Sequence, residues 1–188
     1  MIFQIPELGQ HVWISGFDAA PPSIEELFRR SAERYPDVSV QLVDMDRVPG
    51  QRYLTLAAVN AVKSFHSKQP IAKTLGMELL VYVSGEKQID VALKRVGITP
   101  RTRRVVALAV GDSGEQVSGA AKFLAETLGQ GSNDQLLDDW PEARIQNVRS
   151  DFDIGERELR AVMRKGEPLT SVIERLAVER SAMLAARK

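Results

Sequence analysis

The chain of 188 residues contains no cysteine and only two histidines, His11 and His66. The lack of cysteine excludes disulfide scaffolds and thiolate chemistry. A zinc site on two histidines would need carboxylates or a second chain to complete it, so we expect no structural metal. The chain also lacks a run of about 18 apolar residues and, at its start, the layout of a signal peptide. We therefore expect a cytoplasmic protein, or also a nuclear one in a eukaryote, with no membrane partner.

The composition is that of an ordinary globular protein. Hydrophobic residues make up 44% of the chain and charged residues 27%, close to the averages for soluble domains and far from those of disordered chains. A mass of 20.8 kDa corresponds to one domain. Gly, Ser, Asn and Asp cluster at 129–135. We expect a single domain over residues 1–188, made of an α/β body over 1–128 and a mainly helical tail over 129–188 packed on it.

Charge is unevenly distributed along the chain, although its net value is zero. Residues 51–104 carry ten basic and three acidic side chains, whereas 1–50 and 105–188 are both net acidic. If the ten basic side chains converge in space, they form a positive surface that would suit a nucleic acid. Alternatively they are the solvated faces of two helices. The charge pattern leaves both interpretations open.

Several short segments have the hydrophobic pattern of β-strands. Residues 38–43 alternate apolar and polar side chains, which indicates a strand with one covered face. Residues 77–83 and 105–110 are almost continuously apolar, as in strands covered on both faces. With a helix expected between them, these two segments predict a parallel βαβ unit. Strands are also expected at 2–5 and 12–14.

Helical periodicity is clearest at 53–67, where apolar residues recur every three or four positions. Another helix is expected after Ser23, which can cap it, and should end before Pro36. Further helices are predicted from Ser84 to Gly97, at 113–128, and in the tail at 134–140, 154–165 and 169–186. The predicted fold class is mixed α/β of the α+β type, with a mixed sheet covered by helices and a helical C-terminal region.

Motifs that would anchor an enzyme are scarce. The chain has neither a P-loop nor a nucleophile elbow. Asp44 and Asp46 have the spacing of carboxylates that hold magnesium beside a phosphate, although polar residues that end a strand give the same pattern. The turn at 111–114 could bind an anion at a helix N-terminus, but Asp112 and Glu115 would repel it. We expect no catalytic residues, no metal and no cofactor.

Four blocks of the chain are similar to those of a known family. Two of them are 53–61 and 71–89, the second of which contains Glu-Leu-Leu at 78–80 and Ser-Gly-Glu-Lys-Gln-Ile at 84–89. In the tail, Phe-Asp-Ile at 152–154 and the run at 179–184 agree with the same pattern. These residues resemble the small subunit of the KEOPS complex that binds the Bud-type protein kinase, known as the PRPK-binding protein, TPRKB or CGI-type family.

The resemblance implies a non-catalytic, regulatory subunit in tRNA processing. The KEOPS complex makes the tRNA threonylcarbamoyladenosine (t6A) modification. In that family the subunit binds the Bud-type kinase, which acts as an ATPase, supports it allosterically, and helps to recruit tRNA through the single-stranded 3′ CCA end. The implied partners are therefore this kinase, tRNA and, indirectly, the other KEOPS subunits.

The resemblance also indicates which residues would form the two contact surfaces. For tRNA these are Lys63, Lys68, Ile71, Lys73, Lys87 and Gln88. The residues alone leave a second interpretation open, in which Ile71 is a core residue and the lysines are solvated charge. For the kinase they are Glu179, Arg180, Met183 and Leu184. Here the alternative is an amphipathic helix that only covers the body.

Two other classes of function remain open from the residues alone. A stand-alone tRNA-binding module would bind tRNA equally well without any kinase. A metal-dependent, phosphate-handling enzyme would use Asp44 and Asp46.

Overall fold

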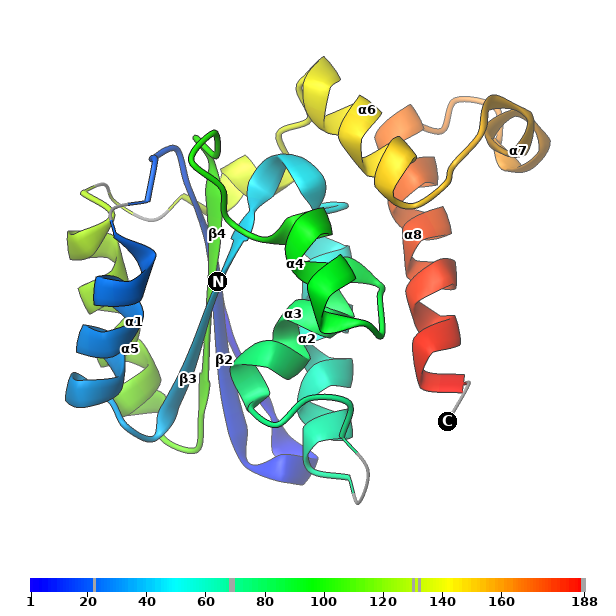
Figure 1. Ribbon diagram of the computed structural model, residues 1–188. Coiled ribbons are helices and arrows are strands. Elements are labelled where there is room, and N and C mark those ends of the chain that lie inside the picture. Colours follow the sequence, from blue (N-terminus) through cyan, green and yellow to red (C-terminus); the bar gives the residue numbers. More distant parts are fainter. Residues whose placement is uncertain (22, 68–69, 130, 132, 187–188) are drawn as a thin grey trace.

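The computed structural model describes residues 1–21, 23–67, 70–129, 131 and 133–186, with side chains as far as residue 182. A sheet lies in the middle, with helices on both of its faces (Figure 1). The strand order is β1-β2-β4-β3, and each neighbouring pair is antiparallel. The expected α+β class and helical C-terminal region are confirmed.

The elements in chain order are β1 (Ile2–Ile5), η1 (Pro6–Leu8), β2 (Gln10–Phe17), α1 (Ile24–Arg34), β3 (Val38–Asp44), η2 (Met45–Arg47), α2 (Gln51–Phe65), α3 (Leu75–Ser84), α4 (Ile89–Val96), β4 (Val105–Gly111), α5 (Gly114–Thr127), η3 (Asp134–Asp138), α6 (Glu142–Asp151), α7 (Glu156–Val162) and α8 (Leu169–Ala186).

The central strand β4 supplies side chains to two separate cores. Its residues point alternately to opposite faces, because side chains in a strand have a period of two. Val106, Leu108 and Val110 join the larger core beneath α2 and α3. Val105, Ala107 and Ala109 join the smaller core beneath α1 and α5. All six side chains are fully buried, which explains the continuous apolar run in the sequence.

The segment 77–83, predicted to be a strand, lies in helix α3, so that prediction is wrong. A short run of apolar residues cannot be assigned to strand or buried helix from periodicity alone. The local cues favour the helix: Thr74 caps it by accepting the N–H of Met77, and Gly85 ends it at a φ of +70°. The helix predicted to start at Ser84 begins instead at Ile89, because 84–85 close α3.

Loss of the 77–83 strand also removes the predicted parallel pair. The crossover in this sheet is formed earlier in the chain, where α1 connects β2 to β3. Both strands pair antiparallel with β4, which lies between them, so β2 and β3 run in the same direction without contact. The sheet is therefore antiparallel throughout the part of the chain that the structure describes.

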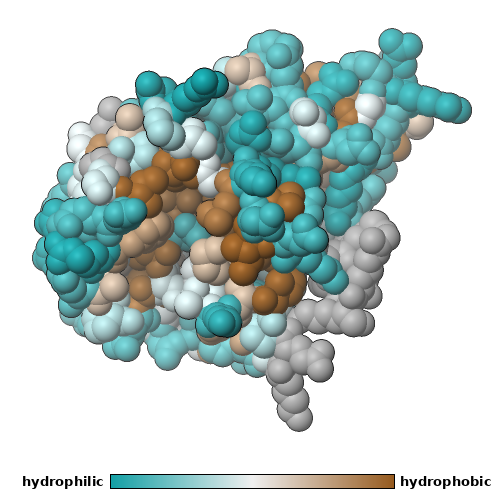
Figure 2. Space-filling model, viewed as in Figure 1, coloured by the Kyte–Doolittle hydropathy of each residue, from teal (hydrophilic) through white to brown (hydrophobic). Residues whose placement is uncertain are grey.

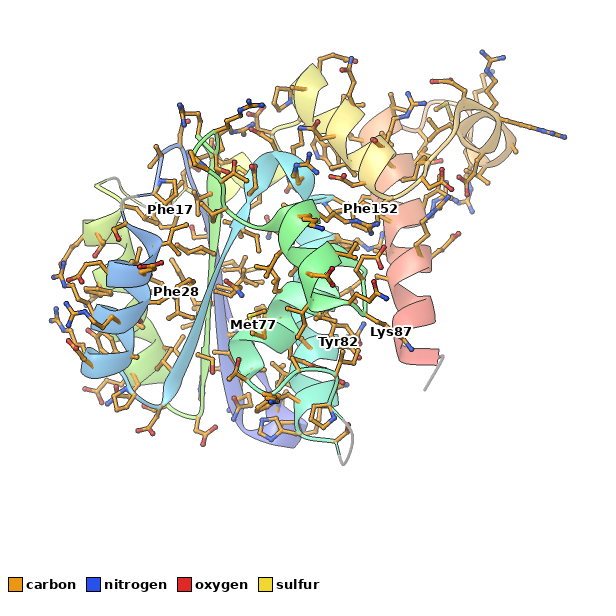
Figure 3. All side chains as sticks on the ribbon, in the orientation of Figure 1. Phe17, Phe28, Met77, Tyr82, Lys87 and Phe152 are labelled. Atoms are coloured by element: carbon orange, nitrogen blue, oxygen red, sulfur yellow. The ribbon has the colours of Figure 1, made fainter. Side chains whose placement is uncertain are left out.

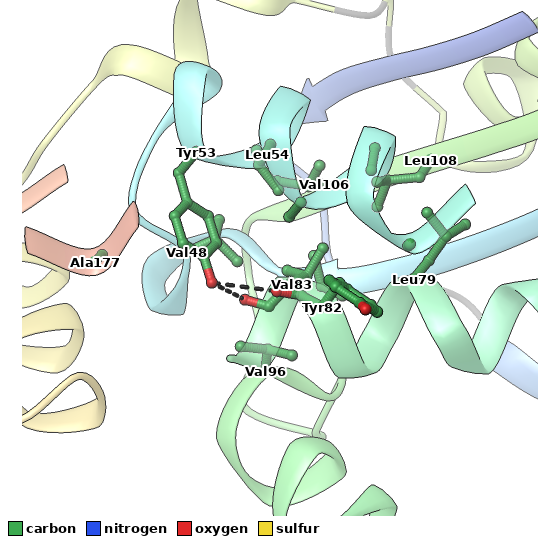
Figure 4. Close-up of a cluster of buried hydrophobic side chains, with 14 of the residues drawn as sticks. Val48, Tyr53, Leu54, Leu79, Tyr82, Val83, Val96, Val106, Leu108 and Ala177 are labelled. Atoms are coloured by element: carbon green, nitrogen blue, oxygen red, sulfur yellow. Dashed lines mark hydrogen bonds between the residues drawn. The ribbon is translucent and has the colours of Figure 1, made fainter. Parts of the chain in front are cut away.

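The tail forms a further helical layer outside α2 (Figure 1). Tyr53 of α2 lies where the layers meet, with its hydroxyl 3.1 Å from the carbonyl oxygen of Val83 and 3.3 Å from that of Tyr82 (Figure 4). Its ring contacts Phe152 edge to face, with 5.4 Å between centroids. Helix α8 adds four buried residues to the larger core: Val172, Ile173, Leu176 and Ala177.

Within the tail, the helix predicted at 169–186 is confirmed as α8. The segment predicted at 134–140 is the short 3-10 helix η3, and α7 is shorter than the predicted helix at 154–165. Helix α6 is not among the elements predicted from the sequence. Across the described residues, no helix is both long and apolar enough to cross a bilayer.

Candidate functional site

Two of the predicted tRNA contacts, Lys63 and Lys73, lie on the same side of the molecule. Lys63 is exposed in the last turn of α2, and Lys73 is exposed two residues before α3 begins. These helix ends lie with the β1–β2 hairpin at the lower end of the sheet in Figure 1. The Nζ of Lys63 is 2.8 Å from Oε1 of Glu7, and this contact lowers the pKa of the Glu7 carboxyl. Because both side chains are about half exposed, the pair opens at little cost when a phosphate competes for the lysine.

The turn that carries Ile71 and Lys73 is held by a buried carboxylate. Glu78, in the first turn of α3, has no exposed surface. Its Oε2 accepts the N–H of Ala72 at 2.6 Å and its Oε1 that of Ile71 at 3.3 Å. Ile71 is half-buried against the larger core, whereas Lys73 points to solvent. The turn is therefore fixed by hydrogen bonds, and it presents Lys73 in a defined position.

A shallow pocket of about 350 Å³ opens beside Lys73 at the end of the sheet, and we call it the sheet-end pocket. The starts of β2 and β3 and the end of β4 form its floor. Its walls are the C-terminal end of α2 and the N-terminal end of α3. The lining residues are Gln10, Asp37, Ser39, Phe65, His66, Lys73, Thr74, Leu75, Val110, Gly111 and Asp112.

The sheet-end pocket combines groups of different chemistry. The rings of Phe65 and His66 meet edge to face, with 6.2 Å between centroids. Asp37 and Asp112 contribute carboxylates, and Lys73 contributes an ammonium group. Of these residues the sequence assigned a contact only to Lys73. Asp37 lies just before β3 and Asp112 just after β4, and the pairing of Val38 with Gly111 brings these two chain segments to the same end of the sheet.

The other predicted tRNA contacts are not gathered at this site. Lys87 and Gln88 are exposed beyond the C-terminal end of α3, whereas Lys73 precedes its N-terminal end. Ten helical residues, at about 1.5 Å each, place the two groups roughly 15 Å apart along the helix. Figure 3 shows this separation between Met77, in the first turn, and Lys87. Lys68 lies outside the described residues.

The predicted kinase contacts lie in the last helix. Glu179 is exposed on α8. Arg180 is tied to the neighbouring helix, because its Nη2 is 2.7 Å from Oε2 of Glu158 and 2.8 Å from the carbonyl oxygen of Asp153. The side chains of Met183 and Leu184 lie outside the described ones. Of the two members whose side chains the structure describes, Glu179 is the one that a partner can reach without breaking a described internal contact.

Hydrophobic side chains also gather on the face shown in Figure 2. One group lies between α1 and β3, and another lies over α3 and α4. Leu93 of α4 is 48% exposed. The exposure of Leu93 could not be predicted from the sequence, because Leu93 follows the same apolar helical spacing as the buried residues Ala92 and Val96.

Asp44 and Asp46 form contacts within the chain. One oxygen of Asp44 accepts the N–H of Asp46 at 3.0 Å, and the other accepts the hydroxyl of Thr102 at 2.8 Å. Asp46 pairs with Arg104 at 3.0 Å. Burial raises the pKa of the Asp44 carboxyl. These contacts join the end of β3 to the segment before β4, which accounts for both carboxylates as structural groups.

An antiparallel sheet with helices on both faces and an outer helical layer defines the general class of this protein. Within that class, a family model described as kinase binding protein CGI-121 matches residues 22–182. The chain belongs to this family of kinase-binding proteins, as the resemblance of 53–61 and 71–89 indicated. A comparison with curated proteins gave no match.

Proposed function

We propose that the protein is a non-catalytic subunit of the KEOPS complex that binds and supports the Bud-type kinase. It would also help to recruit tRNA, through the 3′ CCA end, for threonylcarbamoyladenosine modification. The observation that carries the proposal is the match of the kinase-binding family over residues 22–182, most of the chain. The assignment to the KEOPS complex and the tRNA role go beyond this match and rest on the family resemblance described above. Each is tested separately.

The arrangement of two exposed lysines at this rim of the sheet, Lys63 and Lys73, supports the tRNA role. Lys63 and Lys73 are exposed near the same end of the sheet, and the Glu78 clamp fixes the turn before Lys73. The aromatic pair Phe65 and His66 lies between the two lysines in the chain and borders the sheet-end pocket. Single-stranded nucleic acids are held by phosphate attraction together with stacking on aromatic rings, and this rim offers both.

The tRNA role is tested by reversing the charge of both lysines. We expect the double variant Lys63→Glu, Lys73→Glu to weaken tRNA binding and to reduce its salt dependence. The slope of log K against log salt should fall by about 0.7 for each lost contact to a single-stranded phosphate. Lys165→Glu, an exposed lysine of the tail, is the matched control. Unchanged affinity and slope in the double variant would contradict a tRNA surface at this rim.

For the kinase we propose the exposed face of α8 around Glu179. Removing the whole helix is a poor test, because its buried residues complete the larger core. Glu179→Lys instead changes an exposed charge and leaves the packing intact, with Glu126→Lys on α5 as its control. We expect loss of kinase binding in the first variant alone. If Glu179→Lys binds normally and Leu93→Asp does not, the kinase binds the apolar surface over α4, and the α8 assignment is wrong.

A further inference from the structure

Two groups of apolar side chains lie on either side of the outer edge of β3, the last strand of the sheet (Figure 2). Figure 3 shows Phe28 and Met77 on opposite sides of this strand. The members are half-buried against one of the two cores, except for Leu93, which is 48% exposed. We call them the β3-edge surface, and they are Phe28, Val40 and Ile98 against the smaller core and Met77, Ile89 and Leu93 beside the larger one. Apolar side chains gathered on a surface mark a contact with another molecule.

The outward backbone groups of β3 are in part already occupied. The N–H of Val38 donates to the carbonyl oxygen of Tyr35 at 3.1 Å, and the N–H of Leu42 donates to Oε1 of Gln41 at 2.8 Å. Neither N–H bonds to β4, so both point to the outer edge, as the alternation of an antiparallel ladder requires. A strand that paired with this edge would have to displace both contacts. The β3-edge surface therefore suits a partner that contributes side chains rather than backbone groups.

The charged side chains beside this surface are mainly basic. Lys94 follows Leu93 in α4, and Arg101 and Arg103 lie in the segment between α4 and β4; all three are exposed. Among the described residues no ion pair joins any of the three to a carboxylate, whereas α1, on the opposite side, contains ion pairs of its own. Complementary charge on a partner would therefore be acidic, and a second copy of this chain would bring the same basic side chains.

The composition of the surface distinguishes between a protein and a nucleic acid. Phe28 is the one aromatic member of the β3-edge surface, whereas single-stranded nucleic acids are held by stacking on several aromatic rings. An amphipathic helix satisfies its own backbone groups and presents apolar residues along one stripe. Such a helix meets both requirements of this surface, apolar side chains and no need for backbone pairing.

We propose that the β3-edge surface binds an amphipathic helix of another protein. The apolar stripe of that helix packs on Leu93 and its neighbours, and acidic residues beside the stripe pair with Lys94, Arg101 and Arg103. This surface is separate from the rim proposed for tRNA and from the face of α8 proposed for the kinase, so the inference rests on neither.

The test uses three synthetic helix-forming peptides of equal length, each labelled for fluorescence anisotropy and titrated into the full-length protein. The first has leucines at i, i+3, i+4 and i+7 with glutamates beside them. The second has lysines in place of the glutamates, and the third has the composition of the first with its leucines scrambled. We expect the first peptide to bind about tenfold more tightly than the other two, and its affinity to fall as the salt concentration rises.

Variants of the protein show whether this binding occurs at the proposed surface. Leu93→Asp should weaken binding of the first peptide about tenfold, because a charge that repels the glutamates replaces an apolar contact. The double variant Arg101→Glu, Arg103→Glu should remove the preference for glutamate over lysine. Leu169→Asp changes a leucine of the tail that is 37% exposed, and as the matched control it should bind like the wild type.

Several outcomes would overturn the proposal. They are equal binding of the first and third peptides, binding of none of the three, and unchanged binding by Leu93→Asp. Displacement of the first peptide by saturating Bud-type kinase would assign the surface to the kinase, and displacement by tRNA would assign it to the nucleic acid. A dimer of the protein alone that Leu93→Asp dissociates would assign it to a second copy. Failure of the chain to bind kinase or tRNA would contradict the proposed function and leave the peptide result unchanged.

Discussion

At the scale of single residues, Arg144 is a fully buried cation whose guanidinium donates only to backbone carbonyl oxygens among the described residues. It has no exposed surface, and its guanidinium lies 4.7 Å from the centroid of the Trp140 ring. It donates to carbonyl oxygens from two parts of the chain: Val48, Leu136, Leu137 and Asp139. Burial lowers its pKa to about 10, so it stays charged at neutral pH. Arg144 thereby attaches the segment before α6 to the body.

We expect Arg144→Met to lower the free energy of unfolding by about 3 kcal/mol, because several buried carbonyl oxygens lose their donors. For a chain of this length that is a fall of roughly 6–12 °C in Tm. Arg144→Lys should lose most of the same stability, since an ammonium group lacks the planar array of donors. Thermal unfolding measures both. Arg157→Met, at an exposed position of α7, should unfold like the wild type, and an equal Tm for Arg144→Met would contradict this account.

Ser31 and Ser84 form a contrasting pair of buried serines. The hydroxyl of Ser31 in α1 has no partner among the described residues, whereas that of Ser84 donates to Val81 and accepts from Glu86. Ser31→Ala removes an unsatisfied group and favours the helix, so we expect a gain of about 0.5 kcal/mol in unfolding free energy. Ser84→Ala should lose about 1 kcal/mol. Urea unfolding compares them, and a loss in Ser31→Ala would show that its hydroxyl has a partner.

At the scale of elements, Glu78 connects α3 to the turn that carries Lys73. Gln at this position offers one acceptor oxygen, so one of the two N–H groups that Glu78 binds would face an amide NH2. We expect Glu78→Gln to speed the exchange of the Ala72 amide proton and to weaken tRNA binding, while kinase binding is retained. Hydrogen exchange and tRNA titration measure these effects. Glu115→Gln, an exposed first-turn position of α5, is the control; unchanged exchange at Ala72 would contradict the clamp.

Glu174 connects α8 to α2 by accepting the N–H of Tyr53 at 3.0 Å. Burial raises its pKa above 4.5, so the folded state holds this proton more tightly than the unfolded state. The resulting stability is fully present below the unfolded pKa and is lost as pH rises through the folded pKa. The Gln side chain of the Glu174→Gln variant cannot ionise. We therefore expect the unfolding free energy of this variant to fall less than that of the wild type as pH rises from about 4.5 to 7.

Urea unfolding at several pH values measures this slope. Burial also raises the pKa of Asp44 and Asp151, so part of the slope should persist in Glu174→Gln. Glu126→Gln, on the exposed face of α5, should keep the wild-type slope. If the Glu174→Gln variant also had the wild-type slope, ionisation of Glu174 would not contribute to the pH dependence of the unfolding free energy.

Elements with one buried face were predictable from the sequence, whereas of the two continuously apolar runs only 105–110 was assigned correctly, as β4. The alternation at 38–43 and the helical spacing at 53–67 correspond to β3 and α2, because each has one solvated side. Helix α3 lies between the sheet and other helices, so its pattern does not distinguish it from a strand. Its cap at Thr74 and the glycine at 85 were usable cues. Helix α6 has no distinct apolar face, and the buried contacts of Arg144 were not predictable from spacing.

At the scale of the whole molecule, the predicted site residues fall into separate regions. Lys63, Ile71 and Lys73 belong to neighbouring helix ends, while Lys87 and Gln88 lie beyond the far end of α3. A sequence resemblance indicates single residues but not the distances between them. The separation into two regions could therefore be recognised only from the fold. The same is true of the sheet-end pocket, whose lining comes from segments that are far apart in the chain.

The measurement that tests the central claim most directly is a calorimetric titration of this protein into the Bud-type kinase from the same source. ATP hydrolysis is followed in parallel, with and without tRNA. The account predicts one-to-one binding with submicromolar affinity and an increase in tRNA-dependent hydrolysis, both reduced by Glu179→Lys and unaffected by Glu126→Lys. Absence of binding heat together with unchanged hydrolysis would contradict the role of this chain as a kinase-binding subunit.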